Sequence, residues 1–432
     1  MRNKIKTLLI AGFLLCLGVG AVFSEYKFPP PEFESNYVMP VMEKPAARSG
    51  EMAYFDIFVL AVVILLSAWA SLKKRSRNIM MLISMFSLAY FGFYKEGCIC
   101  PIGSIQDVAA GLFNPGYYIP VSVIIIFTLP LISVLFFGRA YCGGACPHGA
   151  LQDLLLIKEV KIPRWLDRSL SVIAYLYLGA AVLFAINDTV FLICKYDPFV
   201  PFFRMTGPFY MFITGGVFVL LSTVIGRPYC RFFCPYSAIL KPLAIVSKYK
   251  VTITPDKCVV CNLCEESCPF GAINKPENLP RIKSKPGLYP ALFAAAVIFG
   301  AGLGYFSGGY FSGYQKDVKL ALEMHAFDKS LVQEDKLSWD AVEYLKRGES
   351  RELLFKRAEE AKKKFQIRGM LFGVFILLVV LIQVVYANRR PKRDIYEPDS
   401  ARCLSCGRCF TDCPVHREDF KNKLRGIVKI DG

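Results

Sequence analysis

Cysteines at short, regular spacings are the residues of this chain that most clearly predict chemistry. In two runs, two residues separate each of the first three cysteines, three residues precede a fourth, and proline follows. The runs are Cys258, Cys261, Cys264, Cys268 and Pro269, and Cys403, Cys406, Cys409, Cys413 and Pro414. This spacing lets three thiolates wrap one 4Fe–4S cluster. The sequence therefore predicts two such clusters, and zinc is the less favoured alternative because the pattern occurs twice with its C-P ending.

The fourth cysteine of each run is predicted to reach the cluster of the other run. When two such runs pair, the cysteine before proline ligates the second cluster. The two ligand sets are then Cys258, Cys261, Cys264 and Cys413, and Cys403, Cys406, Cys409 and Cys268. Four local ligands per run is the alternative, and it leaves the number of clusters unchanged.

A different cysteine pattern is repeated in the most apolar part of the chain. The string G-R-x-Y-C-x3-C-P begins at Gly138 and again at Gly226, each time after an apolar run. Its four cysteines form a full ligand set for a further iron–sulfur cluster, and packed, reduced cysteines at helix ends are the alternative. They are Cys142, Cys146, Cys230 and Cys234. Arg139 and Arg227 could offset the charge of thiolate-ligated iron, or extend to lipid headgroups.

A third, partial copy begins at Cys98 and Cys100, where C-P-I-G-S-I-Q-D is similar to the C-P-H-G-A-L-Q-D that begins at Cys146. One apolar run separates the two copies, so the third copy is expected at the outer surface, together with Cys194. Three cysteines need a fourth ligand to hold a cluster, and Asp197 is a candidate. A disulfide between Cys194 and Cys98 or Cys100 is the alternative, because the outside is oxidising.

Apolar residues make up 54% of the 432-residue chain and gather in runs of membrane-spanning length, about 17–20 residues. The runs are 7–23, 53–72, 79–95, 120–137, 169–187, 209–226, 288–306 and 369–387. Most basic residues behind the net charge of +17 lie in loops that the positive-inside rule assigns to the cytoplasm. The sequence predicts a mainly α, polytopic protein of the bacterial inner membrane with about seven to eight spans. Both cysteine-rich runs then lie in the cytoplasm, and nucleic-acid binding is excluded.

The apolar runs divide the chain into eight predicted parts. These are a signal anchor or signal peptide at 1–24, an extracytoplasmic Pro-rich segment at 25–52, a membrane core at 53–250, a first ferredoxin half at 251–285, a span at 286–310, an extracytoplasmic helical insert at 311–367, a span at 368–390 and a second ferredoxin half at 391–432. The insert is either a solvated helical hairpin or a docking platform. Haem is excluded, because all three histidines lie outside the apolar runs and the C-x-x-C-H motif for covalent haem attachment is missing. No flavin motif is present.

Together these motifs resemble the membrane-bound polyferredoxin family of the NapH and NosR type. The resemblance covers about 90–275 and the C-terminal cysteine run, including Cys194-x-Tyr196-Asp197-Pro198-Phe199. It implies the electron-transfer subunit of a quinol dehydrogenase-type oxidoreductase complex, in which 4Fe–4S clusters connect the quinone pool, or a cytoplasmic donor, with an extracytoplasmic redox protein. Two departures are a missing flavin-binding domain, which NosR-like proteins carry, and a ferredoxin pair split by the helical insert.

Another function found among such relatives is metallocentre assembly, in which a metal ion such as copper is reduced before insertion into a respiratory enzyme. The outer cysteines Cys98, Cys100 and Cys194 would then handle the metal. A transporter is disfavoured because no charged residue lies in the middle of an apolar run. No sequence pattern marks a quinone site.

Overall fold

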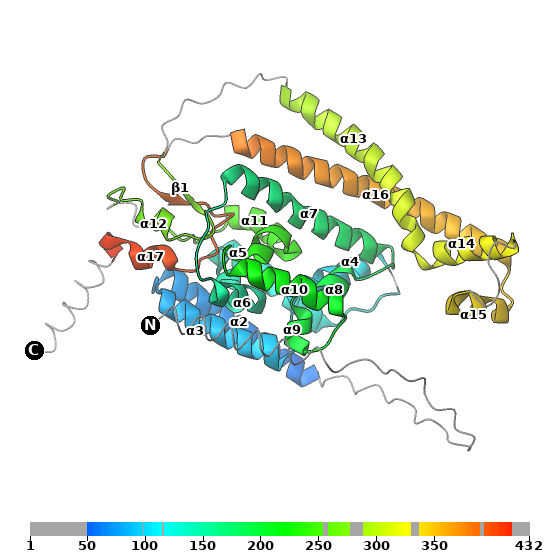
Figure 1. Cartoon of the computed structure of the whole chain (residues 1–432), viewed down its shortest axis with the longest axis horizontal. Helices are drawn as coiled ribbons and strands as arrows, with labels where there is room; N and C mark the ends of the chain where they lie inside the picture. The colour runs from blue at the N-terminus through cyan, green and yellow to red at the C-terminus, as the bar shows by residue number, and fades with distance from the viewer. Residues whose placement is uncertain are drawn as a thin grey trace, which may run out of the picture.

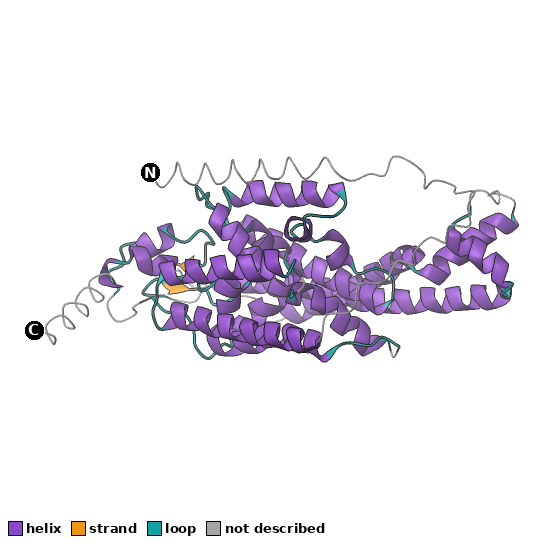
Figure 2. Cartoon of the chain, turned by 90° about the horizontal axis from the view of Figure 1, so that it is seen from below, coloured by secondary structure: helices purple, strands orange, loops and turns teal. Residues whose placement is uncertain are grey.

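The computed structural model describes residues 50–97, 99–114, 116–253, 258–276, 288–329, 337–388 and 393–416. Helices form almost all of the regular structure in these ranges (Figures 1 and 2), so the prediction of a mainly α protein is confirmed. The predicted signal segment, most of the Pro-rich segment and Cys98 lie outside the described residues.

Every predicted apolar run within the described residues forms a helix. Four helices are long and apolar enough to cross a membrane: α2 (Gly50–Leu72), α7 (Arg164–Ile186), α13 (Leu288–Phe311) and α16 (Arg351–Asn388). Three runs form shorter helices: α3 (Arg77–Ser87) continuing as the π-helix η1 (Leu88–Tyr94), α5 (Val121–Phe137) and α10 (Phe209–Ser222). A membrane protein is therefore supported, and the number of spans stays a prediction.

Cysteine–proline pairs begin three short helices of the core: α4 (Pro101–Phe113), α6 (Pro147–Leu155) and α11 (Pro235–Ile245). Proline suits the first helical position because its φ is already fixed and its missing N–H would have no partner there. In both full repeats a π-helix precedes the proline helix, η2 (Tyr141–Ala145) and η3 (Tyr229–Phe233). The internal repeat of the sequence is thus also a repeat of local structure.

Small elements join the two ferredoxin halves at one end of the molecule, called here the ferredoxin end (Figure 1). Strand β1 (Ile273–Asn274) pairs antiparallel with β2 (Glu397–Pro398), and helix α12 (Leu263–Glu266) contacts α17 (Arg408–Asp412). The halves flank α13 and α16 in the sequence. These two helices lie side by side and return the chain to the end from which it left.

Glycines bring the backbones of α13 and α16 into contact. A Cβ built at Gly300 would lie 2.8 Å from the carbonyl oxygen of Gly373, and one at Gly369 would lie 2.6 Å from that of Gly304. Membrane helices use such small residues to pack closely, because close van der Waals contact replaces the hydrophobic effect in lipid. The hairpin that positions the second ferredoxin half therefore depends on residues without side chains.

The predicted helical insert contains η5 (Ser312–Tyr314), α14 (Lys316–Asp328) and α15 (Trp339–Arg347). Its helices share a small apolar core with the first part of α16. This core includes Met324 of α14, Tyr344 of α15 and Leu354 of α16. Helix α16 then continues without a break into the apolar run. The predicted boundary between 367 and 368 therefore falls inside a single helix, near the point where its charged part passes into its apolar part. The insert lies at the opposite end of α13 and α16 from the ferredoxin halves (Figure 1).

Two other short helices complete the core, α8 (Leu192–Tyr196) and α9 (Val200–Arg204). The side chain of Asp197 lies between them, and its Oδ1 accepts the backbone N–H of Phe199 at 2.8 Å and of Val200 at 3.2 Å. These hydrogen bonds satisfy N–H groups at the start of α9 that have no partner within the helix. They fix the carboxylate of Asp197 in the interior, where it is 2% exposed.

Candidate iron–sulfur centres

The eight cysteines of the two ferredoxin runs line two small cavities. Cys258, Cys261, Cys264 and Cys413 line one of them, together with Ile253 and Tyr396. The other is lined by Cys268, Cys403, Cys406 and Cys409, together with Phe270 and Leu404. In each cavity three cysteines come from one run and the fourth from the other run. The residues present therefore fit two clusters with crossed ligands.

The two runs also share an unusual backbone. Val260 and Asn262 have φ values of 52° and 67°, and Ser405 and Gly407, at the matching positions, have 53° and 77°. Alternation of left-handed with ordinary backbone forms concave nests of N–H groups, which bind anionic groups including iron–sulfur clusters. Equal spacing in the sequence has therefore produced equal loops around the two cavities.

The crossed ligand sets predict which single changes affect the same cluster. Cys413→Ser is expected to alter the EPR signal of the cluster that Cys258→Ser alters, because both thiols line one cavity. Cys268→Ser is expected to act like Cys403→Ser for the same reason. EPR spectra of the four reduced variants test this. Local ligation is the correct assignment if Cys413→Ser instead reproduces the spectrum of Cys403→Ser.

The four repeat cysteines come together in the apolar core. Cys146, Cys230 and Cys234 are buried there, and Cys142 packs against the same apolar cluster. Cys230 and Cys234 both lie within electrostatic range of Cys142 and Cys146. Gln152 connects the two repeats, since its Nε2 donates to the Sγ of Cys230 at 3.2 Å and its Oε1 accepts the backbone N–H of Tyr229 at 3.0 Å.

This arrangement fits a polynuclear cluster better than a single metal ion. Among the residues that the structure describes, no three His, Cys, Asp or Glu side chains are placed to share one ion. A 4Fe–4S cluster uses four thiolates that bind separate irons, so its ligands are more widely spaced. The four repeat cysteines, which the sequence assigns either to a cluster or to packing, gather at one apolar cluster and match the number of ligands of a 4Fe–4S cluster.

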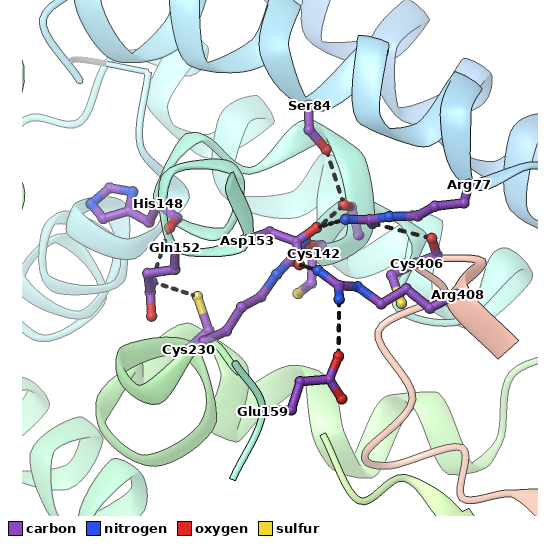
Figure 3. A network of polar contacts seen from close by, with 12 residues as sticks. Arg77, Ser84, Cys142, His148, Gln152, Asp153, Glu159, Cys230, Cys406 and Arg408 are labelled. Atoms are coloured by element: carbon purple, nitrogen blue, oxygen red, sulfur yellow. Dashed lines mark hydrogen bonds and ion pairs between the residues drawn. The ribbon is translucent and has the colours of Figure 1, made fainter. Parts of the chain in front are cut away.

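A buried group of charges joins the repeat to the second ferredoxin half (Figure 3). The carboxylate of Asp153 lies 2.5 Å from Arg77, 3.1 Å from Arg408 and 3.2 Å from Arg227. Burial opposes ionisation of Asp153, but the three guanidinium groups outweigh it and hold the pKa of this carboxyl well below its usual range. Asp153 therefore stays charged and connects α3, α6, the second repeat and α17.

The same arginines donate to backbone carbonyls beside the cysteines. Arg227 donates to the carbonyl of Cys142 and, at 3.1 Å, to that of Gly143, and Arg77 donates to the carbonyl of Cys406 at 3.3 Å. Arg139 lies 3.9 Å from the Sγ of Cys142. Arg139 and Arg227 are 3% and 0% exposed, so extension to lipid headgroups is ruled out for both. Their charges lie where thiolate-ligated iron would need them.

His148, to which the sequence analysis assigns no role, lies buried beside Asp197. Its side chain is 1% exposed, and its Nε2 is 3.4 Å from the Oδ2 of Asp197. The ring is also within electrostatic range of Cys146 and Cys100. One difference between the copies of the motif could have drawn attention to His148. Histidine follows C-P only in the copy that begins at Cys146, and the other two copies have Ile102 and Tyr236 at this position.

The predicted outer cysteines are only partly described. Cys100 and Cys194 are both free thiols, so no disulfide joins them. Cys194 lies beside α4, with its Sγ 3.6 Å from a Cβ built at Gly103. Cys100 precedes α4 and lies within electrostatic range of the repeat cysteine Cys146, and the side of the membrane that it faces stays a prediction. Helices α4 and α6 both begin inside the core.

Comparisons with known families agree with this reading of the cysteines. Residues 97–120, 118–164 and 206–253 match a family described as a 4Fe-4S binding domain, and residues 251–274 match another family with the same description. The matched ranges contain all four repeat cysteines and the first ferredoxin run. The chain therefore carries 4Fe–4S ferredoxin-type domains.

Three proteins with partial similarity extend this comparison. "Putative electron transport protein YccM" of Escherichia coli is 27% identical over 122 residues, which are 26% of this chain and 34% of that protein. Two uncharacterized proteins of Methanocaldococcus jannaschii also match. MJ0749 is 30% identical over 67 residues, which are 16% of this chain and 27% of MJ0749. MJ0750 is 27% identical over 184 residues, which are 42% of this chain and 77% of MJ0750. This chain thus spans only about a third of YccM and about a quarter of MJ0749. No solved structure matches the chain.

Proposed function

We propose that this chain is a membrane-bound electron-transfer protein that connects the quinone pool, or a cytoplasmic donor, with an extracytoplasmic redox partner through 4Fe–4S clusters. One observation carries the proposal, namely that the ferredoxin and repeat cysteines belong to one packed unit. Cys142, Cys268 and Cys403 all pack against one buried apolar group that contains Cys406. The name of YccM, an electron transport protein, supports the same function class.

The order of the groups through the molecule supports a relay. The cavity lined by Cys403, Cys406 and Cys409 adjoins Cys142, and the repeat cysteines adjoin His148 and Cys100. A bound 4Fe–4S cluster supplies reversible one-electron chemistry. The protein's own residues hold the cysteines together, exclude water through apolar packing and place the cations Arg139 and Arg227 beside them. Cys100 and Cys194 mark the end of the relay that lies away from the ferredoxin halves.

The proposal places the ferredoxin halves in the cytoplasm and the insert on the outer side of a bacterial inner membrane. The positions of the two parts at opposite ends of α13 and α16 support this orientation, since both helices are long and apolar enough to cross a bilayer. The basic residues that flank the apolar runs agree with it. The shorter helices α5 and α10, and α3 with η1, account for the other predicted spans among the described residues in this arrangement.

Transmembrane electron passage can be measured directly in vesicles. The purified protein is reconstituted with ferricyanide enclosed and dithionite outside, because neither ion crosses lipid readily. Ferricyanide should be consumed faster than in protein-free vesicles, and Cys230→Ser should return the rate to that background because it removes a repeat cysteine from the relay. A wild-type rate equal to that of protein-free vesicles, with iron fully incorporated, contradicts the proposed function.

A further inference from the structure

A cavity of about 220 Å³ lies between three helices near the ferredoxin end of the core. Helix α7 contributes Ser171 and Tyr175, α16 contributes Ile382 and Tyr386, and α11 contributes Ile245. Ile245, Ile382 and Tyr386 are 50%, 65% and 47% exposed, so they form the mouth of the cavity. Because α7 and α16 are long and apolar enough to cross a membrane, this mouth faces the region that lipid chains would occupy.

The inner wall of the cavity belongs to the candidate iron–sulfur centres. Cys230, a repeat cysteine that is 8% exposed, lines the cavity. Leu404, which directly follows Cys403 of the second ferredoxin run, lines it as well. A molecule that enters from the lipid side therefore comes to rest against two of the predicted cysteine sets.

The polar side chains that line the cavity carry hydrogen-bond donors. The buried Nε of Arg168 has no hydrogen-bond partner in the described part of the chain. Tyr175 and Tyr386 add phenol groups. The Nζ of Lys241 donates to the carbonyl of Arg231 at 3.1 Å, and burial lowers the pKa of Lys241 to about 7. A ligand with hydrogen-bond acceptors at its polar end would satisfy the unpartnered group.

We propose that this cavity binds the head group of a membrane quinone. A quinone combines an apolar ring, two carbonyl oxygens that accept hydrogen bonds and an isoprenoid tail that needs an apolar exit, and the cavity offers a counterpart to each. The inference rests on the proposed function and assigns the place at which the quinone pool meets the chain. Arg168 and Tyr175 are the residues assigned to the carbonyl oxygens.

An anionic phospholipid head group is the competing ligand, because cations outnumber carboxylates in the lining. The charged residues are Arg139, Arg168, Arg231, Lys241 and Arg402, with Asp167 and Asp399. Most of these cations are already engaged. Arg231 and Arg402 bind Asp167 at 2.5 and 3.0 Å, and Arg139 donates to Ser237 at 2.7 Å. Thiolate-ligated iron at Cys230 would add negative charge, which disfavours a phosphate and leaves a neutral ring unaffected.

Photolabelling of the full-length, iron-loaded protein with an azido-quinone tests the site. In the wild type the label should attach to peptides of α7 or α16. Ser171→Trp, which fills the cavity from α7, should reduce labelling at least about tenfold, which corresponds to about 1.4 kcal/mol of binding free energy. Leu176→Trp is the matched control, because Leu176 lies on the same helix, is 46% exposed and does not line the cavity. Ile382→Trp, from the opposite wall, should repeat the loss if Ser171→Trp folds poorly.

The same samples are reduced with quinol and, separately, with dithionite, and followed by EPR. Loss of labelling and of quinol-driven reduction in Ser171→Trp or Ile382→Trp, with dithionite reduction intact, supports the site. Equal labelling or equal quinol-driven reduction in these variants and the wild type overturns the site but leaves the proposed function standing. Displacement of the label by anionic phospholipid and not by unlabelled quinone also overturns it. Failure of quinol to reduce the wild type, while the vesicles still pass electrons, removes both this site and the quinone as a donor.

Discussion

Arg227→Met is expected to lower the stability of the folded protein by about 3–5 kcal/mol, the cost of removing one partner from a buried ion pair. Arg227 is fully buried, binds the carboxylate of Asp153 and donates to the carbonyls of Cys142 and Gly143. Methionine fills a similar volume but leaves these three acceptors without that donor. Because the carbonyls belong to a repeat segment, iron held by the repeat cysteines should be lost with the stability.

Thermal unfolding in detergent and iron analysis measure these two effects. Arg347→Met is the matched control, since Arg347 and its partner Glu343 are 62% and 60% exposed and such a surface pair contributes only about 0–1 kcal/mol. Arg227→Lys should restore part of the stability, because lysine keeps the charge but lacks the planar fork that reaches several acceptors at once. A melting temperature and iron content of Arg227→Met equal to those of the wild type would show that this contact is not structural.

Gly304→Leu is expected to separate α13 from α16 and with them the two ferredoxin halves. A Cβ at position 304 would overlap the carbonyl oxygen of Gly369, and this atom is backbone that a side-chain rotation cannot move away. Overpacking of a tight contact costs about 1–3 kcal/mol, and Gly300 and Gly308 of α13 also make close backbone contacts with α16. Crossed ligation needs both halves, so both ferredoxin clusters should be lost together.

Gly302→Leu provides the control on the same helix. A Cβ at position 302 meets no atom within 4 Å, so leucine there should point away from α16 and leave the hairpin intact. Iron content and protease sensitivity of the two variants should therefore differ, with about eight fewer irons per chain in Gly304→Leu. Two normal ferredoxin signals in Gly304→Leu would mean that the halves pair without help from the hairpin.

The features that the sequence predicted are those encoded by local patterns. Apolar runs of membrane length predicted the positions of α2, α7 and α13, and cysteine spacing predicted which residues line the two ferredoxin cavities. The repeated C-x3-C-P string likewise predicted that the two copies share a local structure. Each of these signals lies within a few turns of chain, where side-chain spacing alone limits the conformations available.

The features that the sequence did not predict arise from contacts between distant segments. Asp153 ends the string C-P-H-G-A-L-Q-D, which predicts no ion pair, and its role depends on Arg77 and Arg408, which lie far away in the sequence. His148 gains its position from Asp197 in the same way. The closeness of Cys100 to the repeat could not be foreseen either, because counting apolar runs assigns a side of the membrane but no depth. The contacts of these three residues are set by tertiary packing alone.

Iron analysis combined with EPR of the purified, reduced protein tests most directly whether the repeat cysteines hold a cluster between the ferredoxin pair and the far end. With four irons per cluster, the wild type should contain about twelve irons per chain, and Cys142→Ser or Cys230→Ser should lower this by about four while both ferredoxin signals persist. A wild-type value near eight that neither substitution changes would contradict the account, because the two ferredoxin clusters would then have no partner inside the membrane core.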